Sequence, residues 1–403
     1  NDYLEIKDIN IPHSYLDEFK DTFDELLENY RDRLIDVSVI HAFNGVPVHD
    51  CDENVQQILS DLGFESMGDG ERYIRGGVVD PMPRKKINRI LFHHHSLHQK
   101  TRHENETIAL DHLDELRDDF ALRGRCEMFR VDLKSMAAAH QLHQGTNLRG
   151  HLVWAKMPHF QKLLTIRNVQ APEEDEDILQ FFREHHDPAI FMERHAMRRG
   201  EFRKLISPLV RSGHLVQDYR GGFKAVEPLA TSDLWEVKRD YLRDLVKDYP
   251  VITLKQVERL AGSPFSAEEI SDVMREFEED DTLIKGFLVD DMHDVCWGRH
   301  DLLEGSDILS KTRDLVIPPS DPLIHYYGSL LRERFGYGSA YLVFHREEPV
   351  AAFKANTREG VIHITDFVGD SDLEKEALRV MKEFAWEHDM PLKGKLYERL
   401  RSR

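Results

Sequence analysis

The chain has 403 residues, 40% of them hydrophobic and 32% charged, and its 54 lysines and arginines against 74 acidic residues give a formal net charge of -20. At roughly 100–200 residues per domain, this length predicts two to four domains. No apolar run approaches the roughly 18–20 residues of a membrane helix. The cysteines Cys51, Cys126 and Cys296 form no CxxC pair, which argues against a disulfide scaffold and a thiolate zinc site. No N-terminal signal segment is recognisable, so we expect a cytoplasmic protein.

The first 80 residues predict helices followed by a hairpin. Apolar residues at three- and four-residue spacing over 13–43 indicate a long amphipathic helix and then a helical or extended piece. Residues 53–62 predict a short helix that Gly63 ends, and a hairpin around residues 68–70 follows. A short helix followed by a hairpin is the second half of a winged helix. Residues 80–84 then predict a linker.

The region 81–178 is predicted to be helical with one strand. Helices are expected over 87–100, 107–120 and 131–144, and the strand over 148–157. The acidic run at 172–177 indicates a domain boundary or a helix start.

Residues 188–227 carry the clearest local pattern. A short helix ends before a turn at Arg199-Gly200, a second helix ends at Gly213, and two strands flank Gly221-Gly222. Two helices followed by a glycine-tipped hairpin predict a winged helix, which we place in a domain over 179–230.

The same pattern repeats in the next 85 or so residues, 231–316. A helix over 233–247 precedes a helix over 253–262, and a further helix begins after Ser266. Ser266 is predicted to be its N-cap, with Glu269 at the capping-box position. A hairpin over 282–298 completes a second, acidic winged helix.

The last domain, 317–403, has a different pattern. It predicts a helix over 321–336, three strands over 340–368 and an amphipathic closing helix over 371–389. The whole chain is therefore predicted to be α+β, with tandem winged-helix domains followed by a small β-sheet or partial-barrel domain with a closing helix.

The two predicted winged helices differ in charge. Residues 188–227 hold eight basic and four acidic side chains, a net of +4, whereas residues 264–294 hold two basic and eleven acidic ones, a net of −9. A helix in a DNA groove faces phosphates, so we expect the basic unit to contact DNA and the acidic one to be a spacer. The candidate DNA-binding residues are Arg198, Arg199, Arg203, Lys204, Arg220 and Lys224. Alternatively, these charges form the solvated face of a protein-binding module.

Histidines and glutamines form two polar clusters. In the first, at 93–103, His94 and His98 have the spacing of a metal clamp, but no acidic neighbour completes an HExxH motif, so we predict no metal. A polar or basic helix face that continues from Arg84, Lys85 and Lys86 toward DNA is the preferred interpretation. The second cluster, 140–144, is either a solvent-facing helix end or a site where a neutral histidine orients a water. The sequences GxxxxGK[ST], GxGxxG and GxSxG are absent, so we expect no cofactor.

Four segments occur in an order that resembles one family. They are residues 131–160 with Arg149-Gly150, residues 209–226, residues 320–344 with Arg334-Phe335-Gly336, and residues 352–364 with Lys354. Together they are similar to the winged-helix DNA glycosylases related to AlkZ and YcaQ, and to the related C-terminal region of Lhr-type helicases.

The resemblance implies that the chain flips a damaged base out of the duplex and hydrolyses its N-glycosidic bond, with Arg149 and Lys354 near the DNA. The family holds the water with a Gln-x-Gln or Gln-x-Asp motif, which has no clean match in this sequence. By order along the chain the candidates are His98 and Gln99, and then Gln141 and His143. Ala352 stands where the family often has an acidic residue.

Two functions follow from these patterns. The first is a monofunctional DNA glycosylase that excises alkylated or crosslinked bases from damaged duplex DNA without a metal or cofactor. The alternative is a non-catalytic winged-helix module that binds nucleic acid for a helicase or for a repair or transcription complex. The order of the family segments favours the enzyme, and the missing glutamine motif favours the module.

Overall fold

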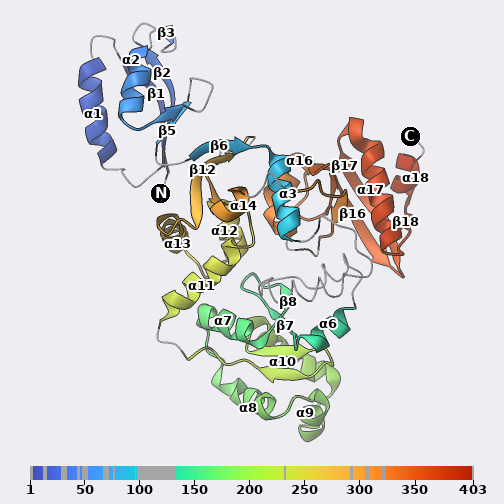
Figure 1. Ribbon diagram of the computed structural model, residues 1–403. Coiled ribbons are helices and arrows are strands. Elements are labelled where there is room, and N and C mark those ends of the chain that lie inside the picture. Colours follow the sequence, from blue (N-terminus) through green and yellow to red (C-terminus); the bar gives the residue numbers. More distant parts are fainter. Residues whose placement is uncertain are drawn as a thin grey trace. The chain divides into compact units, whose positions relative to one another are not determined.

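The computed structural model describes most of the chain, namely residues 3–11, 16–28, 34–42, 46–47, 53–66, 72–75, 78–95, 97, 132–230, 233–290, 294–304, 309–319, 321 and 323–401 (Figure 1). The chain divides into two compact units. The first comprises Asn1–Ile87, Tyr249–Leu254 and Ser271–Asp307, and the second Asn88–Asp248, Lys255–Ile270 and Ile308–Arg403. In the described part, no helix combines the length and the apolar character that crossing a bilayer requires.

The N-terminal sheet of the first unit begins with a βαβ arrangement. Strands β1 (Tyr3–Ile11) and β2 (Leu34–Ala42) are parallel neighbours, and α1 (Leu16–Glu28) provides the crossover that parallel pairing needs. The remaining elements of this part are β3 (Val46–Pro47), α2 (Glu53–Asp61), β4 (Glu65–Ser66) and β5 (Arg72–Arg75). The sheet order is β1-β2-β5-β4, with β3 on β2.

This arrangement corrects the winged-helix-like prediction for residues 1–80. The short helix α2, its end near Gly63 and the β4–β5 hairpin are confirmed, but β1 was not predicted and the expected long helix stops at Glu28. In β2 the β-branched residues Ile35, Val37, Val39 and Ile40 favour a strand, which is the extended alternative that the sequence left open for this piece.

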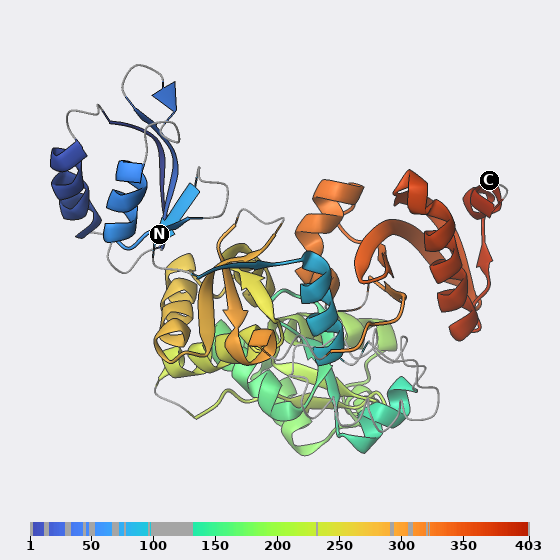
Figure 2. The same cartoon turned by 45° about the horizontal axis from the view of Figure 1, so that its top comes forward.

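A second sheet of the first unit has the order β11-β13-β12-β6. Its strands are β6 (Val78–Met82), β11 (Val251–Thr253), β12 (Leu283–Val289) and β13 (Cys296–Arg299). The predicted hairpin is confirmed as the antiparallel pair β12–β13. The predicted linker at 80–84 is wrong, because β6 pairs in parallel with β12. Figure 2 shows that this strand continues directly into the helix α3 (Arg84–His94). The helices α13 (Ala267–Glu279) and α14 (His300–Glu304) flank these strands in the sequence.

In the second unit, a four-stranded sheet joins residues that are far apart in sequence. Its order is β10-β9-β7-β8. The strands are β7 (His143–Thr146), β8 (Leu152–Ala155), β9 (Leu215–Asp218) and β10 (Phe223–Ala225). The associated helices are α6 (Leu133–Ala139), α7 (Met157–Arg167), α8 (Glu176–Glu184), α9 (Pro188–Arg194) and α10 (Arg199–Ser212). Phenylalanines of α8, α9, α10 and β10 form one buried core.

The helix predicted over 131–144 is shorter than expected. α6 ends at Ala139, Gln141 has a positive φ of 53°, and His143 already belongs to β7. Pairing of β7 with β8 on one side and β9 on the other overrides the local helical spacing. The strand predicted over 148–157 is likewise reduced to Leu152–Ala155, because residues 147–151 form a turn.

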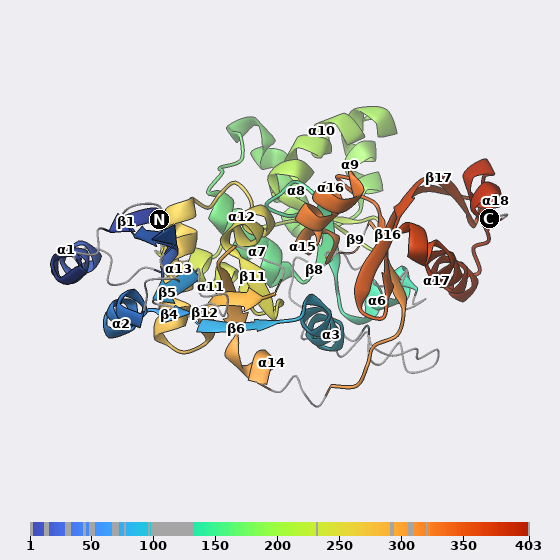
Figure 3. The same ribbon diagram turned by 90° about the horizontal axis from the view of Figure 1, so that it is seen from above.

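The C-terminal sheet of the second unit has the order β14-β15-β16-β17-β18. Its strands are β14 (Leu315–Ile317), β15 (Tyr341–His345), β16 (Glu348–Arg358), β17 (Val361–Gly369) and β18 (Leu392–Lys393). Its helices are α15 (Leu323–Tyr326), α16 (Gly328–Phe335), α17 (Glu374–Glu387) and α18 (Lys395–Arg401). The three predicted strands and the closing helix α17 are confirmed, and α17 lies along the sheet (Figure 3). The single helix predicted over 321–336 is two helices that break at Tyr327.

Candidate nucleic-acid interface

The basic residues predicted to bind DNA lie on α10 and on the β9–β10 hairpin. Phe202, Ile206 and Leu209 bury one side of α10 in the phenylalanine core, so its cationic side faces solvent. All six candidates are exposed, and none has an ion-pair partner within the described residues; they are Arg198, Arg199, Arg203, Lys204, Arg220 and Lys224. On the hairpin, the Arg220 Nε donates to the Tyr219 hydroxyl at 2.7 Å. Unneutralised cations on a rigid surface are what a phosphate backbone requires.

The acidic segment around α13 has its charges engaged locally. The predicted capping box is confirmed, because the Ser266 N–H donates to Glu269 Oε2 at 2.8 Å and the Glu269 N–H donates to Ser266 Oγ at 3.1 Å. The same Glu269 carboxylate pairs with Lys238 at 2.6 Å, and these bonds hold its pKa low against the opposing effect of burial.

A polar cluster lies at the end of β7. His143 is opposite Asp218 of β9, and Lys224 of β10 and His186 are near enough to act on the His143 ring electrostatically. Burial lowers the pKa of His143, Lys224 lowers it further, and Asp218 opposes them. The His143 Nδ1 is buried and has no hydrogen-bond partner within the described part of the chain. This environment favours the neutral form of the His143 ring.

The other candidates for positioning the water do not belong to this polar cluster in the described structure. Gln141 is exposed in a left-handed backbone conformation two residues before His143. His98 and Gln99 lie outside the described residues. Gln144, which the sequence analysis did not select, follows His143 on β7 and is opposite Gln217 of β9.

Arg149 lies in a turn between β7 and β8 that Asn147 organises. The Asn147 Oδ1 accepts from the N–H groups of Arg149 at 3.1 Å and His151 at 2.9 Å. Arg167 supports the turn from α7 by donating to the carbonyl oxygens of Thr146 at 2.7 Å and Asn147 at 2.6 Å. The predicted Arg149-Gly150 strand dipeptide is thus a turn whose backbone is firmly held.

Lys354 is exposed on β16. Its Nζ lies 4.8 Å from the centre of the Tyr337 ring, and Asp366 is its cross-strand neighbour. Burial, and then Asp366, raise the pKa of Tyr337. The Tyr337 ring thus holds the exposed Lys354 ammonium by a cation–π contact beside the Asp366 carboxylate.

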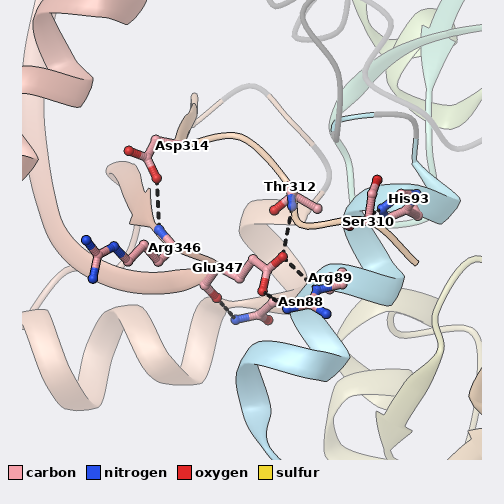
Figure 4. A network of polar contacts seen from close by, with 8 residues as sticks. All are labelled: Asn88, Arg89, His93, Ser310, Thr312, Asp314, Arg346 and Glu347. Atoms are coloured by element: carbon pink, nitrogen blue, oxygen red, sulfur yellow. Dashed lines mark hydrogen bonds and ion pairs between the residues drawn. The ribbon is translucent and has the colours of Figure 1, made fainter. Parts of the chain in front are cut away.

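The helix α3 (Arg84–His94) carries the remaining basic candidates in the first unit. Arg84 and Lys86 are partly buried and Lys85 is exposed. From Asn88 onward α3 belongs to the second unit, where Glu347 of the β15–β16 turn accepts two bonds from Arg89, each 2.7 Å long, and one from the Thr312 N–H at 2.9 Å (Figure 4). Arg89 and the Thr312 N–H hold the pKa of Glu347 low despite burial.

The histidines at the end of α3 have structural partners. His93 Nε2 contacts the Ser310 carbonyl at 2.8 Å (Figure 4), and His95, only 3% exposed, contacts the Asp248 carbonyl at 2.9 Å. The expectation that this whole cluster forms a polar face therefore fails at His95. Within the described residues, no three His, Cys, Asp or Glu side chains gather as metal ligands would.

Comparison with known proteins gives a structural match only. No protein-family model matches the sequence, and no curated protein does. The fold is similar to that of the Streptomyces sahachiroi DNA glycosylase AlkZ, with a TM-score of 0.54 and 12% sequence identity. The likeness covers 78% of this chain and 100% of that chain. The match confirms the part of the predicted resemblance that concerns AlkZ, as a likeness of fold.

Proposed function

We propose that this chain is a DNA glycosylase that hydrolyses the N-glycosidic bond of an alkylated or crosslinked base in duplex DNA. The observation that carries the proposal is the fold likeness, which extends over the whole length of a DNA glycosylase. The order of α9, α10, β9 and β10 supports interpreting residues 179–230 as a winged helix, with α10 as the helix that contacts DNA. The order of β11, α12 (Leu254–Ala261), α13, β12 and β13 along the chain supports the same interpretation for the acidic segment.

The charge distribution supports DNA as the partner. The net charge of -20 opposes general binding to nucleic acid, so contact must come from a local basic face. The exposed cations of α10 and the β9–β10 hairpin provide such a face, because no carboxylate within the described residues neutralises them.

Residues at the polar end of β7 are proposed to orient the water that attacks the sugar. An alkylated purine is a good leaving group, so one positioned water and a site that stabilises a positively charged sugar can suffice. His143 fits this role because its ring is neutral and its buried Nδ1 has no partner in the described structure. Gln141, and outside the described residues His98 and Gln99, remain alternatives for holding the same water.

The test is single-turnover excision on duplexes that contain an alkylated purine or an interstrand crosslink, with alkaline cleavage of the abasic product. We expect the parent chain to release the base. Removing a general base or water-orienting group costs roughly 10²–10⁴ in rate. At least one of His143→Ala, Gln141→Ala, His98→Ala and Gln99→Ala should therefore fall by this factor while DNA affinity is retained.

The control is Gln170→Ala, an exposed glutamine in the segment between α7 and α8. It should excise and bind like the parent. A parent that binds DNA tightly and leaves every lesion intact would overturn the enzyme and leave the non-catalytic nucleic-acid-binding module.

A further inference from the structure

Three segments of the second unit meet near the end of α12 (Leu254–Ala261). The stacked rings of His151 and His325, 5.5 Å apart, join the β7–β8 turn to α15. Gln256 donates to the Tyr326 carbonyl at 3.0 Å, which joins α12 to the same helix. Gly262, at the end of α12, approaches the turn so closely that a Cβ there would lie 3.1 Å from Arg149 Cγ.

Two arginines at this junction have unused donors. Arg259 Nη2 donates to Ser329 Oγ at 3.0 Å, but its Nη1 is buried and lacks an acceptor in the described structure. The Arg149 Nε is likewise buried and lacks an acceptor in the described structure. Neither guanidinium has an ion-pair partner among the described residues. Arg167 is a contrast, because it donates to the carbonyl oxygens of Ser212, Thr146 and Asn147 at 3.0, 2.7 and 2.6 Å.

Positive charge near Arg259 is not matched by negative charge. Burial lowers the pKa of Arg259, nearby Arg332 lowers it further, and only Glu333 opposes them. A buried cation without a partner is costly, and a buried donor without an acceptor adds to that cost. A purely structural arginine is expected to have the acceptors that Arg167 has.

Other parts of these side chains reach the surface. Arg149 and Arg259 are only partly buried, and His151 is exposed. The imidazole and guanidinium groups of this junction offer N–H donors in several directions.

We propose that Arg149, Arg259 and the stacked His151–His325 pair form a phosphate-binding site for a phosphodiester of the DNA backbone. Guanidinium groups form strong, directed hydrogen bonds to phosphate oxygens, and an incoming phosphate supplies the acceptors and the negative charge that this junction lacks. The choice of DNA as the source of the phosphate rests on the proposed function. Arg259 would then bring part of the acidic segment into DNA contact, although that segment was expected to be only a spacer.

The first experiment measures affinity for an undamaged duplex at several salt concentrations. Arg259→Gln and Arg149→Gln should each weaken binding and lower the slope of log K against log salt by about 0.9, the value for one phosphate contact. Lys255→Gln is the matched control, because it removes an exposed charge from the same helix, and it should leave the slope unchanged. Slopes equal to the parent's in both arginine variants would overturn the proposal.

The second experiment separates this role from a structural one. Arg259→Met should not lower the melting temperature, because it removes an unpaired charge, whereas Arg167→Met should lower it by several degrees. Inorganic phosphate, compared with chloride at equal ionic strength, should raise the melting temperature of the parent more than that of Arg259→Met. A melting temperature that falls as far in Arg259→Met as in Arg167→Met would assign Arg259 to folding and overturn the site.

The outcomes also distinguish this inference from the proposed function. A parent that excises lesions, with arginine variants that keep the full salt slope, would overturn the phosphate site and leave the glycosylase standing. A parent that excises no lesion, with arginine variants whose salt slope is reduced, would overturn the glycosylase and leave the phosphate site standing. Stabilisation by inorganic phosphate without any change in DNA affinity would show a site for the free anion and overturn the assignment to DNA.

Discussion

His143 combines a lowered pKa with a ring nitrogen that has no described partner. If the neutral ring orients the hydrolytic water, excision depends on its unprotonated fraction. Since burial and Lys224 lower the pKa below the ordinary value of about 6.5, the neutral form predominates at pH 7 and is lost only in more acidic solution. The expected rate therefore reaches its plateau at a lower pH than an ordinary histidine would allow, and it falls as the pH drops through the lowered pKa.

This prediction is checked on a duplex with a permanently cationic alkylpurine, so that the substrate does not titrate in the same range. Single-turnover rates are compared for the parent and His143→Asn between pH 5 and 8. The variant should lose both most of the rate and the acidic limb. An unchanged acidic limb in His143→Asn would assign the titration to another group.

Replacing either of two glycines of the second unit with alanine is expected to change the free energy of unfolding, in opposite directions. A Cβ on Gly145 of β7 would lie 2.5 Å from Phe160 Cε1 and 2.8 Å from Val216 Cγ1, both in the packed interior. Gly145→Ala should therefore lower the free energy of unfolding by about 1–3 kcal/mol through overpacking. Gly200, in the first turn of α10, has nothing within 4 Å of a Cβ.

Gly200→Ala should instead raise the free energy of unfolding by up to about 1 kcal/mol, because alanine is the better helix former. Chemical denaturation of both variants checks the pair. Equal effects of the two changes would contradict the packing described for β7 and α7.

Among the elements, α3 depends on one buried ion pair for its position in the second unit. Glu347 is only 4% exposed, and Arg89 forms a two-bond pair with it while Asn88 donates to the Glu347 carbonyl at 2.7 Å. Arg89→Met leaves a buried carboxylate without its cation, which typically costs about 3–5 kcal/mol. The double variant Arg89→Met with Glu347→Leu removes both charges and should recover much of that loss.

The comparison pair is Arg379 and Glu383 of α17, whose side chains are 48% and 39% exposed. Glu383→Gln should cost no more than about 1 kcal/mol, because solvent screens an exposed pair. Denaturation midpoints decide the prediction. A loss in Arg89→Met as small as that in Glu383→Gln would show that the ion pair does not hold α3.

Local signals predicted individual elements well and pairing between distant segments poorly. The Ser266–Glu269 capping box was predicted correctly because its atoms lie within one helical turn. β1 and β6 were missed, and β7 was predicted as helix, because their strands are defined by partners far away in sequence. Of the proposed phosphate site, the sequence indicated only Arg149, through the family resemblance. Arg259 and His325 were missed for the same reason, because they join Arg149 only in the folded second unit.

At the scale of the whole molecule, the proposed DNA binding would have to overcome the chain's own net charge of -20. Binding then has to depend on where the cations lie, because phosphate contacts act within a Debye length of about 8–10 Å. We expect the exposed cations of α10 to account for a large part of the affinity, and the carboxylates of the acidic segment to account for little.

The decisive measurement compares Arg199→Ala, Arg203→Ala and Lys204→Ala, alone and together, with neutralisation of exposed carboxylates. Each lost phosphate contact should lower the salt slope by about 0.9, so the triple variant should lose up to about 2.7. Glu268→Gln and Glu279→Gln are suitable controls, because both residues are exposed. Glu269 is unsuitable, since its carboxylate caps α13 and pairs with Lys238. If the triple variant kept the parent's slope while the carboxylate variants changed it, the DNA contact would lie on the acidic segment, and α10 would be the solvated face of a different interaction.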